Sequence, residues 1–249
     1  MHLTQMDWIL AGVGALLIGF AKTGVPGTGI LVVPIMALVF GAKESVGIVT
    51  PMLIVGDIFA VAYYRRHAQW PQLWRLVPWI IPGILLGCAV WLALEGQAGT
   101  RMFSPLVGWI VMAMLALDLL RKRMGWNDMP HQPWFTALTG VTGGATTYIA
   151  NAAGPIMNLY FLSFGLPKQQ FIGTAAWYFM IVNMSKIPFY LYLGIVNRDS
   201  IGVNLAMVPL IAIGAILGIL VFHRIPQKLF NSLIVVLAAA AAVKLIFFS

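Results

Sequence analysis

Cysteine and charged residues are both scarce in this chain of 249 residues. The single cysteine, Cys88, excludes an internal disulfide, a cysteine metal cluster and a two-thiol redox relay. Only 9% of the residues are charged and 61% are hydrophobic, more apolar surface than a soluble domain of this size needs. The sequence also lacks a His-Glu-x-x-His zinc pattern, a Gly-x-Ser-x-Gly elbow and a Walker lysine loop. We therefore expect no enzyme activity, no metal and no cofactor.

The apolar residues form long runs, which indicates an all-α polytopic membrane protein. Runs long enough to span a bilayer lie at about 44–64, 76–94, 102–120, 168–195, 200–222 and 228–248. The net charge of +8 does not indicate nucleic-acid binding, because the basic residues cluster in short loops between these runs. Gly83 and Gly87 have the small-xxx-small spacing that is typical of close helix packing.

The stretch 22–34 interrupts the first apolar run. Three glycines and a proline between residues 24 and 29 cannot continue a regular helix. The flanking segments, 8–21 and 29–40, are each about half of the roughly 20 residues that a full span needs. Such a break survives at membrane depth only where it is buried in protein or lines a wet cavity. It is therefore the first candidate for a binding site.

A second broken stretch, 143–154, lies between predicted half-spans at 134–147 and 152–165. The Pro-Ile-Met of residues 34–36 recurs beside it at 155–157. Two broken segments at corresponding places are typical of a transporter built from repeats, with its site between them. The sequence thus predicts a first repeat (1–124), a cytoplasmic linker (125–133) and a second repeat (134–249). Each repeat is expected to hold one Gly/Pro-broken hairpin of two half-spans and three full transmembrane helices.

The distribution of Lys and Arg predicts the orientation of the two repeats. If the loop with Arg65, Arg66 and Arg75 is cytoplasmic and each half-span pair is a hairpin, nine basic residues lie inside and four outside. If each pair is instead one kinked span, the numbers are eight and five. Both alternatives remain open, and the charge rule favours hairpins. Hairpins make the two repeats inverted and place both chain ends outside the cytoplasm.

Three ionisable side chains fall inside membrane segments. A lysine at the depth of Lys22 costs roughly 2.5–3.5 kcal/mol to insert, so we expect it to bind substrate, to pair with an acid or to snorkel to the interface. For Lys186, binding and snorkelling are equally plausible. Asp57, the one carboxylate deep in a span, either pairs with a membrane lysine or couples transport to protons. Its counterpart in the second half is Asn183.

The predicted anion site lies between the two breaks. Helix N-termini near Thr28 and Ala152 would offer free N–H groups and a partial positive charge. Lys22 would supply a full charge, with Lys186 assisting. The expected substrate-binding residues are Lys22, Thr23, Gly24, Gly27, Thr28, Gly29, Thr146, Thr147, Asn151, Gly154 and Lys186, and the expected coupling residue is Asp57.

The broken stretch 22–34, followed by Lys-Glu-Ser-Val-Gly at 43–47 and Tyr-Tyr-Arg-Arg at 63–66, resembles the sulfite exporter family TauE/SafE. The likeness covers nearly the whole chain. It implies a multi-pass transporter of the bacterial inner membrane that exports sulfite or a small organosulfonate such as sulfoacetate by alternating access. The second half departs from the family's glycine-rich opening with Asn-Ala-Ala-Gly-Pro at 151–155, which leaves the substrate open.

A passive channel for anions or small solutes is the alternative function. Two hairpins that meet at mid-membrane resemble the aquaporin plan, and Asn-Ala-Ala at 151–153 is close to Asn-Pro-Ala. Ile30 stands where the first half would need the paired asparagine. A non-transporting scaffold or sensor is a third class, but the chain has no signalling domain. The expected partners are a small anion and the lipid bilayer, not nucleic acid, and a homo-oligomer remains possible.

Overall fold

The structure is a computed structural model that describes residues 3–25, 28–93, 97–125, 133–162, 164, 166–221, 236, 239–240 and 242–247. This part of the chain is mostly helical and forms no strand, so the predicted all-α class is confirmed. The α-helices are α1 (Gln5–Thr23), α2 (Val32–Phe40), α3 (Ala42–Tyr64), α4 (Trp70–Ala93), α5 (Gln97–Met124), α6 (Pro133–Ala150), α7 (Gly154–Leu162), α8 (Lys168–Tyr192) and α9 (Arg198–Val221). Two short 3-10 helices, η1 (Thr28–Leu31) and η2 (Arg65–His67), precede α2 and follow α3.

Several of these helices are suited to a membrane. α1, α3 with η2, α4 and most of α9 are long and apolar enough to cross one. Large apolar side chains such as Trp74, Leu85 and Leu205 cover the outside of the bundle, each at least half exposed. A water-soluble protein would bury many of these side chains. Together, these features are those of a multi-pass membrane protein.

α1 is longer than the half-span that its sequence predicts. A capping box starts it early: the Asp7 N–H donates to the Thr4 side chain, and the Asp7 carboxylate accepts from the Thr4 N–H. The helix continues through Thr23 because the Gly24 N–H still donates to the Phe20 carbonyl. At 19 residues α1 has the length of a full span, so the prediction of a half-length first segment was wrong. The short second segment is confirmed, since α2 has only nine residues.

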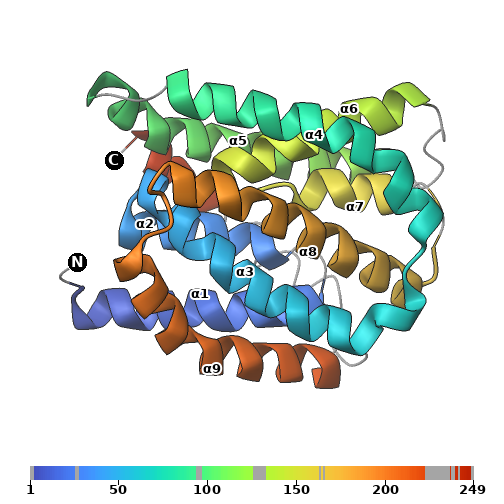
Figure 1. Cartoon of the computed structure of the whole chain (residues 1–249), viewed down its shortest axis with the longest axis horizontal. Helices are drawn as coiled ribbons and strands as arrows, with labels where there is room; N and C mark the ends of the chain where they lie inside the picture. The colour runs from blue at the N-terminus through green and yellow to red at the C-terminus, as the bar shows by residue number, and fades with distance from the viewer. Residues whose placement is uncertain are drawn as a thin grey trace.

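The second broken pair follows a related plan. α6 covers 18 residues and α7 nine, with the break at 151–153. Gly143 and Gly144 therefore lie inside a continuous helix, and the prediction that the interruption begins there was wrong. Their role is in packing, because a Cβ at Gly144 would lie 2.7 Å from the Ile80 carbonyl of α4. In both pairs the short helix packs against the long one, α2 against α1 and α7 against α6 (Figure 1).

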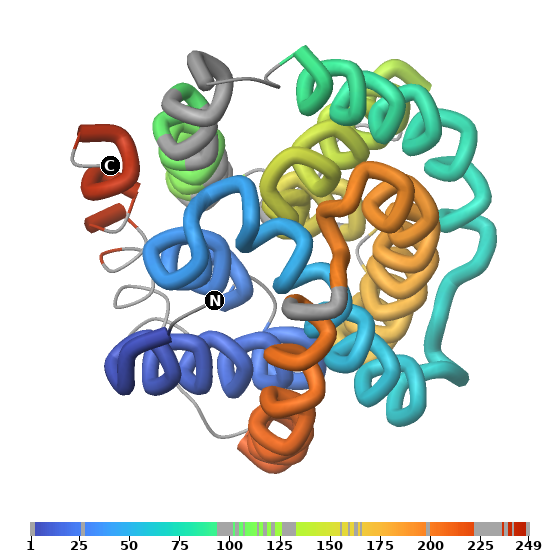
Figure 2. The backbone as a smooth tube through the Cα atoms, turned by 60° about the vertical axis from the view of Figure 1, so that its left-hand side comes forward, coloured from blue at the N-terminus to red at the C-terminus, as the bar shows by residue number. Residues whose placement is uncertain are grey.

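Two of the closest helix contacts are built alike. α4 packs against α6, and α9 packs against α1 at an angle (Figure 2). A Cβ at Gly83 of α4 would come within 2.4 Å of the Val141 carbonyl, and one at Gly214 of α9 within 2.1 Å of the Leu16 carbonyl. The predicted close packing at Gly83 and Gly87 is thus confirmed. The proline and glycines have the same spacing in both helices, at Pro78, Gly83 and Gly87 in α4 and at Pro209, Gly214 and Gly218 in α9.

α3 and α8 pack against each other in the middle of the bundle and run in opposite directions (Figure 1). Gly173, near the start of α8, lies against the Tyr64 carbonyl at the end of α3. Gly47, near the start of α3, lies against the Ile195 carbonyl beyond the end of α8. This central pair carries Asp57 and Lys186, and it is flanked by both breaks.

Candidate functional site: a cavity between two helix breaks

The two breaks line one cavity of about 100 Å³. Its wall comes from the end of α1, from η1, from the start of α2, from the end of α6 with the residues that follow it, and from α3, α7 and α8. By the same kind of measure one water needs roughly 10–15 Å³, so the cavity has room for several waters or a small polyatomic ion. Segments more than 100 residues apart in the sequence thus line one cavity, whose mostly apolar wall carries a few polar side chains.

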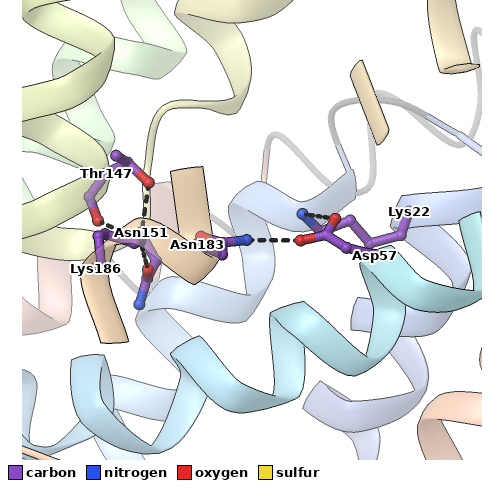
Figure 3. A network of polar contacts seen from close by, with 6 residues as sticks. All are labelled: Lys22, Asp57, Thr147, Asn151, Asn183 and Lys186. Atoms are coloured by element: carbon purple, nitrogen blue, oxygen red, sulfur yellow. Dashed lines mark hydrogen bonds and ion pairs between the residues drawn. The ribbon is translucent and has the colours of Figure 1, made fainter. Parts of the chain in front are cut away.

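Lys22 is the only charged side chain on the described part of the cavity wall. Its ammonium Nζ lies 2.7 Å from Asp57 Oδ1 and 4.1 Å from the centre of the Phe179 ring. The Lys22 side chain is 12% exposed, whereas that of Asp57 is completely buried. Asn183 donates from Nδ2 to the second carboxylate oxygen, Oδ2, over 2.7 Å (Figure 3). The carboxylate is therefore held on both sides, by an ammonium and by an amide.

A second polar cluster surrounds Lys186, one helical turn beyond Asn183 on α8. Its Nζ donates to Asn151 Oδ1 over 2.7 Å, and to the carbonyl and hydroxyl oxygens of Thr147 over 3.1 Å each. Lys186 is fully buried, so it does not snorkel to an interface. All three acceptors are neutral, and in the described part of the chain Lys186 forms no ion pair. In Figure 3 Asn183 lies between this cluster and the Lys22–Asp57 pair.

Asn151 holds an unusual backbone conformation at the second break. Its φ of 52° is in the left-handed region, where a short polar side chain is tolerated better than most. Thr50 of α3 donates to Asn151 Oδ1 over 3.2 Å, and Asn151 Nδ2 donates to the Val46 carbonyl over 3.2 Å. The side chain of Asn151 therefore joins α3 to Lys186 of α8. Because α7 begins three residues later at Gly154, the first turn of that helix also borders the cavity.

The structure brings some of the predicted site residues together and leaves others apart. Lys22, Gly29, Thr147, Asn151 and Gly154 line the cavity, and Lys186 contacts two of them. Asp57 touches the cavity only through Lys22 and Asn183. Gly27 lies outside the described residues.

Four other predicted residues are not on the described cavity wall. Thr23 donates to the Ala215 carbonyl over 2.7 Å, and Gly24 packs on α9 at Gly218. The hydroxyls of Thr28 and Thr146 donate to carbonyl groups of their own segments. Their polar groups are satisfied by backbone, so their placement supports helix packing and turn formation rather than contact with a substrate.

Several lining residues were not predicted to be in the site, among them Asn158 and Phe179. Asn158 is a polar residue inside the short apolar helix α7, a pattern that could have indicated a cavity-facing position. Phe179 gave no such indication, because its contact with Lys22 depends on how α1 packs near α8. Asn183 was recognised only as the counterpart of Asp57, yet it is a cavity residue whose Oδ1 has no hydrogen-bond partner among the described residues.

The family model described as Sulfite exporter TauE/SafE matches residues 10–245, which is nearly the whole chain. No curated protein shows a significant match. No solved structure does so either.

Proposed function

The chain belongs to the sulfite exporter TauE/SafE family, and from this premise we propose that it is a secondary transporter that exports sulfite or a small organosulfonate such as sulfoacetate. The family supports a membrane transporter of sulfite or related anions. The observation that supports an anion site in this chain is the cavity between the two breaks, with Lys22 as the one charged side chain on its described wall.

The anion would bind to Lys22 and to neutral donors nearby. The first turn of α7 borders the cavity at Gly154, and helix N-termini favour anions through free N–H groups and a partial positive charge. The side-chain amide of Asn158 would add a donor from the same helix. One full charge with several neutral donors suits a transporter, because a substrate held by many charges would not be released.

Asp57 would couple anion binding to a proton. In the structure the Asp57 carboxylate is already paired with the Lys22 ammonium, so an incoming anion competes with this carboxylate for Lys22. Protonation of Asp57 removes that competitor and leaves the Lys22 ammonium available to the substrate. Anion binding should therefore tighten as the pH falls, with one proton taken up per anion.

The halves of the chain, 1–124 and 134–249, would be inverted repeats that alternate access to the cavity between the two sides of the membrane. Support comes from the two long–short helix pairs, from the matching proline and glycine spacing in α4 and α9, and from the Lys/Arg distribution. Cysteine labelling at positions 3 and 247 tests the topology. We expect both sites to react with impermeant reagents from outside the cytoplasm, and labelling of either only from the cytoplasmic side would contradict inverted repeats.

Calorimetry with sulfite, sulfoacetate, sulfate and acetate tests the anion site. Lys22→Gln should weaken binding of the preferred anion by roughly ten- to a hundredfold, as loss of a charge-assisted hydrogen bond does. The double variant Lys22→Gln/Asp57→Asn removes both charges and avoids a stranded carboxylate, and it should bind equally poorly. Lys244→Gln, an exposed lysine, is the matched control. Wild-type affinity in the double variant would remove Lys22 from the site.

Flux into proteoliposomes separates a carrier from a passive channel. A carrier predicts saturable uptake that increases when the same anion is loaded on the far side. Linear, non-saturating flux would instead support a channel. The described cavity wall favours the carrier, because the first break presents Ile30 and no counterpart of Asn151.

A further inference from the structure

A second, smaller cavity of about 10 Å³ lies on the other side of Asn151. Asn151 and Val33 line both cavities and so separate them. The large cavity is bordered by α8 from Ile172 to Asn183, and the small one by the first two turns of α3. α3 and α8 run in opposite directions (Figure 1). The large cavity therefore extends toward one end of the bundle, and the small one lies toward the other.

The barrier between them combines the apolar side chain of Val33 with a polar cluster around Asn151. Asn151 Oδ1 accepts from Lys186 and Thr50, and its Nδ2 donates to the Val46 carbonyl. These bonds connect the second break to both central helices. They are exchangeable hydrogen bonds, which a small anion with several acceptor oxygens could replace at the ammonium of Lys186.

Lys186 is an unusual group to find in this position. A buried ammonium is normally paired with an anionic group, since neutral acceptors compensate only part of its desolvation. In the described part of the chain the only ion pair is between Lys22 and Asp57, and Asp57 is already held by Lys22 and Asn183. Lys186 therefore has only neutral direct hydrogen-bond partners, just beyond the large cavity.

We propose that Lys186 is a second anion-binding station on the transport path, and that Asn151 and Thr147 hold its ammonium until an anion leaves Lys22. The anion would then replace Asn151 and Thr147 as the acceptor of the Lys186 hydrogen bonds, and the release of Asn151 would open the path into the small cavity. The ligand class is an oxyanion of a few heavy atoms. This proposal rests on the proposed function and adds a transfer step between two lysines.

The proposal predicts that binding and transport depend on different lysines. Lys186→Gln should keep the anion affinity within about threefold of the wild type but lower the rate of sulfite counterflow at least tenfold. Lys186→Arg keeps a positive charge and should recover part of the rate, whereas Lys22→Gln/Asp57→Asn should lose affinity itself. Lys244→Gln serves as the control. Wild-type counterflow in Lys186→Gln overturns the proposal, and so does a loss of affinity equal to that of the Lys22 double variant.

A labelling experiment tests the barrier without depending on the substrate. In a Cys88→Ala background, Ala175→Cys lies on the large cavity and Ser45→Cys on the small one. A sulfonate-bearing methanethiosulfonate reagent should label the two cysteines from opposite sides of the membrane. If both cysteines label from the same side, or if Ser45→Cys does not label, the proposal that a barrier separates the two cavities is wrong. If the cysteines label from opposite sides but no tested anion binds the wild type, the barrier stands and the proposed function fails.

Discussion

The two halves of this chain pack alike but distribute charge differently. Each half has one helix with a proline and two glycines at the same spacing, α4 in the first half and α9 in the second. Each of these helices packs against a long helix of the other half, α4 against α6 and α9 against α1. At the centre, however, the first half contributes the carboxylate of Asp57, whereas the second half contributes the amide of Asn183 that donates to it. The carboxylate pairs with Lys22, and Lys186 is left with neutral acceptors.

The comparison shows that a shared scaffold can support two different polar clusters. Backbone packing depends on small residues at the contact points, and these are present in both halves. The polar clusters depend on single side chains, since Lys22 pairs with the Asp57 carboxylate whereas Lys186 donates to neutral acceptors. Three predictions test this comparison, in order of decreasing effect.

The largest difference should be in stability after removal of each lysine. Lys22→Met strands the Asp57 carboxylate and should lower the free energy of unfolding by about 3–5 kcal/mol. Lys186→Met strands no charge and should leave stability unchanged or increase it. The double variant Lys22→Met/Asp57→Leu should recover most of the loss. Unfolding in mixed detergent micelles measures all three, and equal losses for the two single variants would show that the clusters do not differ in this way.

The two close helix contacts should respond equally to a single methyl group. The new Cβ would lie 2.4 Å from a facing carbonyl oxygen in Gly83→Ala and 2.1 Å from one in Gly214→Ala. Each variant should lower the free energy of unfolding by about 1–3 kcal/mol. Gly202→Ala is the control in α9, because nothing lies within 4 Å of its Cβ. If only one of the two variants is destabilised, the two helix contacts do not pack in the same way.

The smallest effect concerns proton coupling, which should require a carboxylate at the contact between residues 57 and 183. A one-unit pH gradient should support about tenfold anion accumulation if one proton moves with each anion, or about 1.4 kcal/mol. Asp57→Asn should abolish this accumulation and spare anion exchange. The swap Asp57→Asn/Asn183→Asp restores a carboxylate at the same contact and should restore part of it. Unchanged accumulation in Asp57→Asn would leave Asp57 as a structural ion-pair partner.

Much of the architecture follows from local composition. Apolar runs predicted most of the helices to within a few residues, and the Gly/Pro stretch placed the first break correctly. The sequence also singled out Lys22, Lys186 and Asp57, because an ionisable side chain in an apolar run is costly wherever it is placed. The length of α1 was underestimated, because the capping box at its start is a hydrogen-bond pattern of two residues and not a feature of the apolar run.

The pairing of Asp57 with a membrane lysine, one of the two predicted alternatives, is confirmed, but the sequence did not indicate which lysine it would be. The pairing of Lys22 with Asp57, the neutral acceptors of Lys186 and the cavity shared by two distant breaks all depend on how α1, α3, α6 and α8 pack. Thr23 and Thr146 show the same limit, since their hydroxyls were expected in the site and donate to backbone carbonyls instead. Local sequence sets the cost of burying each polar group, whereas only tertiary packing decides which neighbour compensates it.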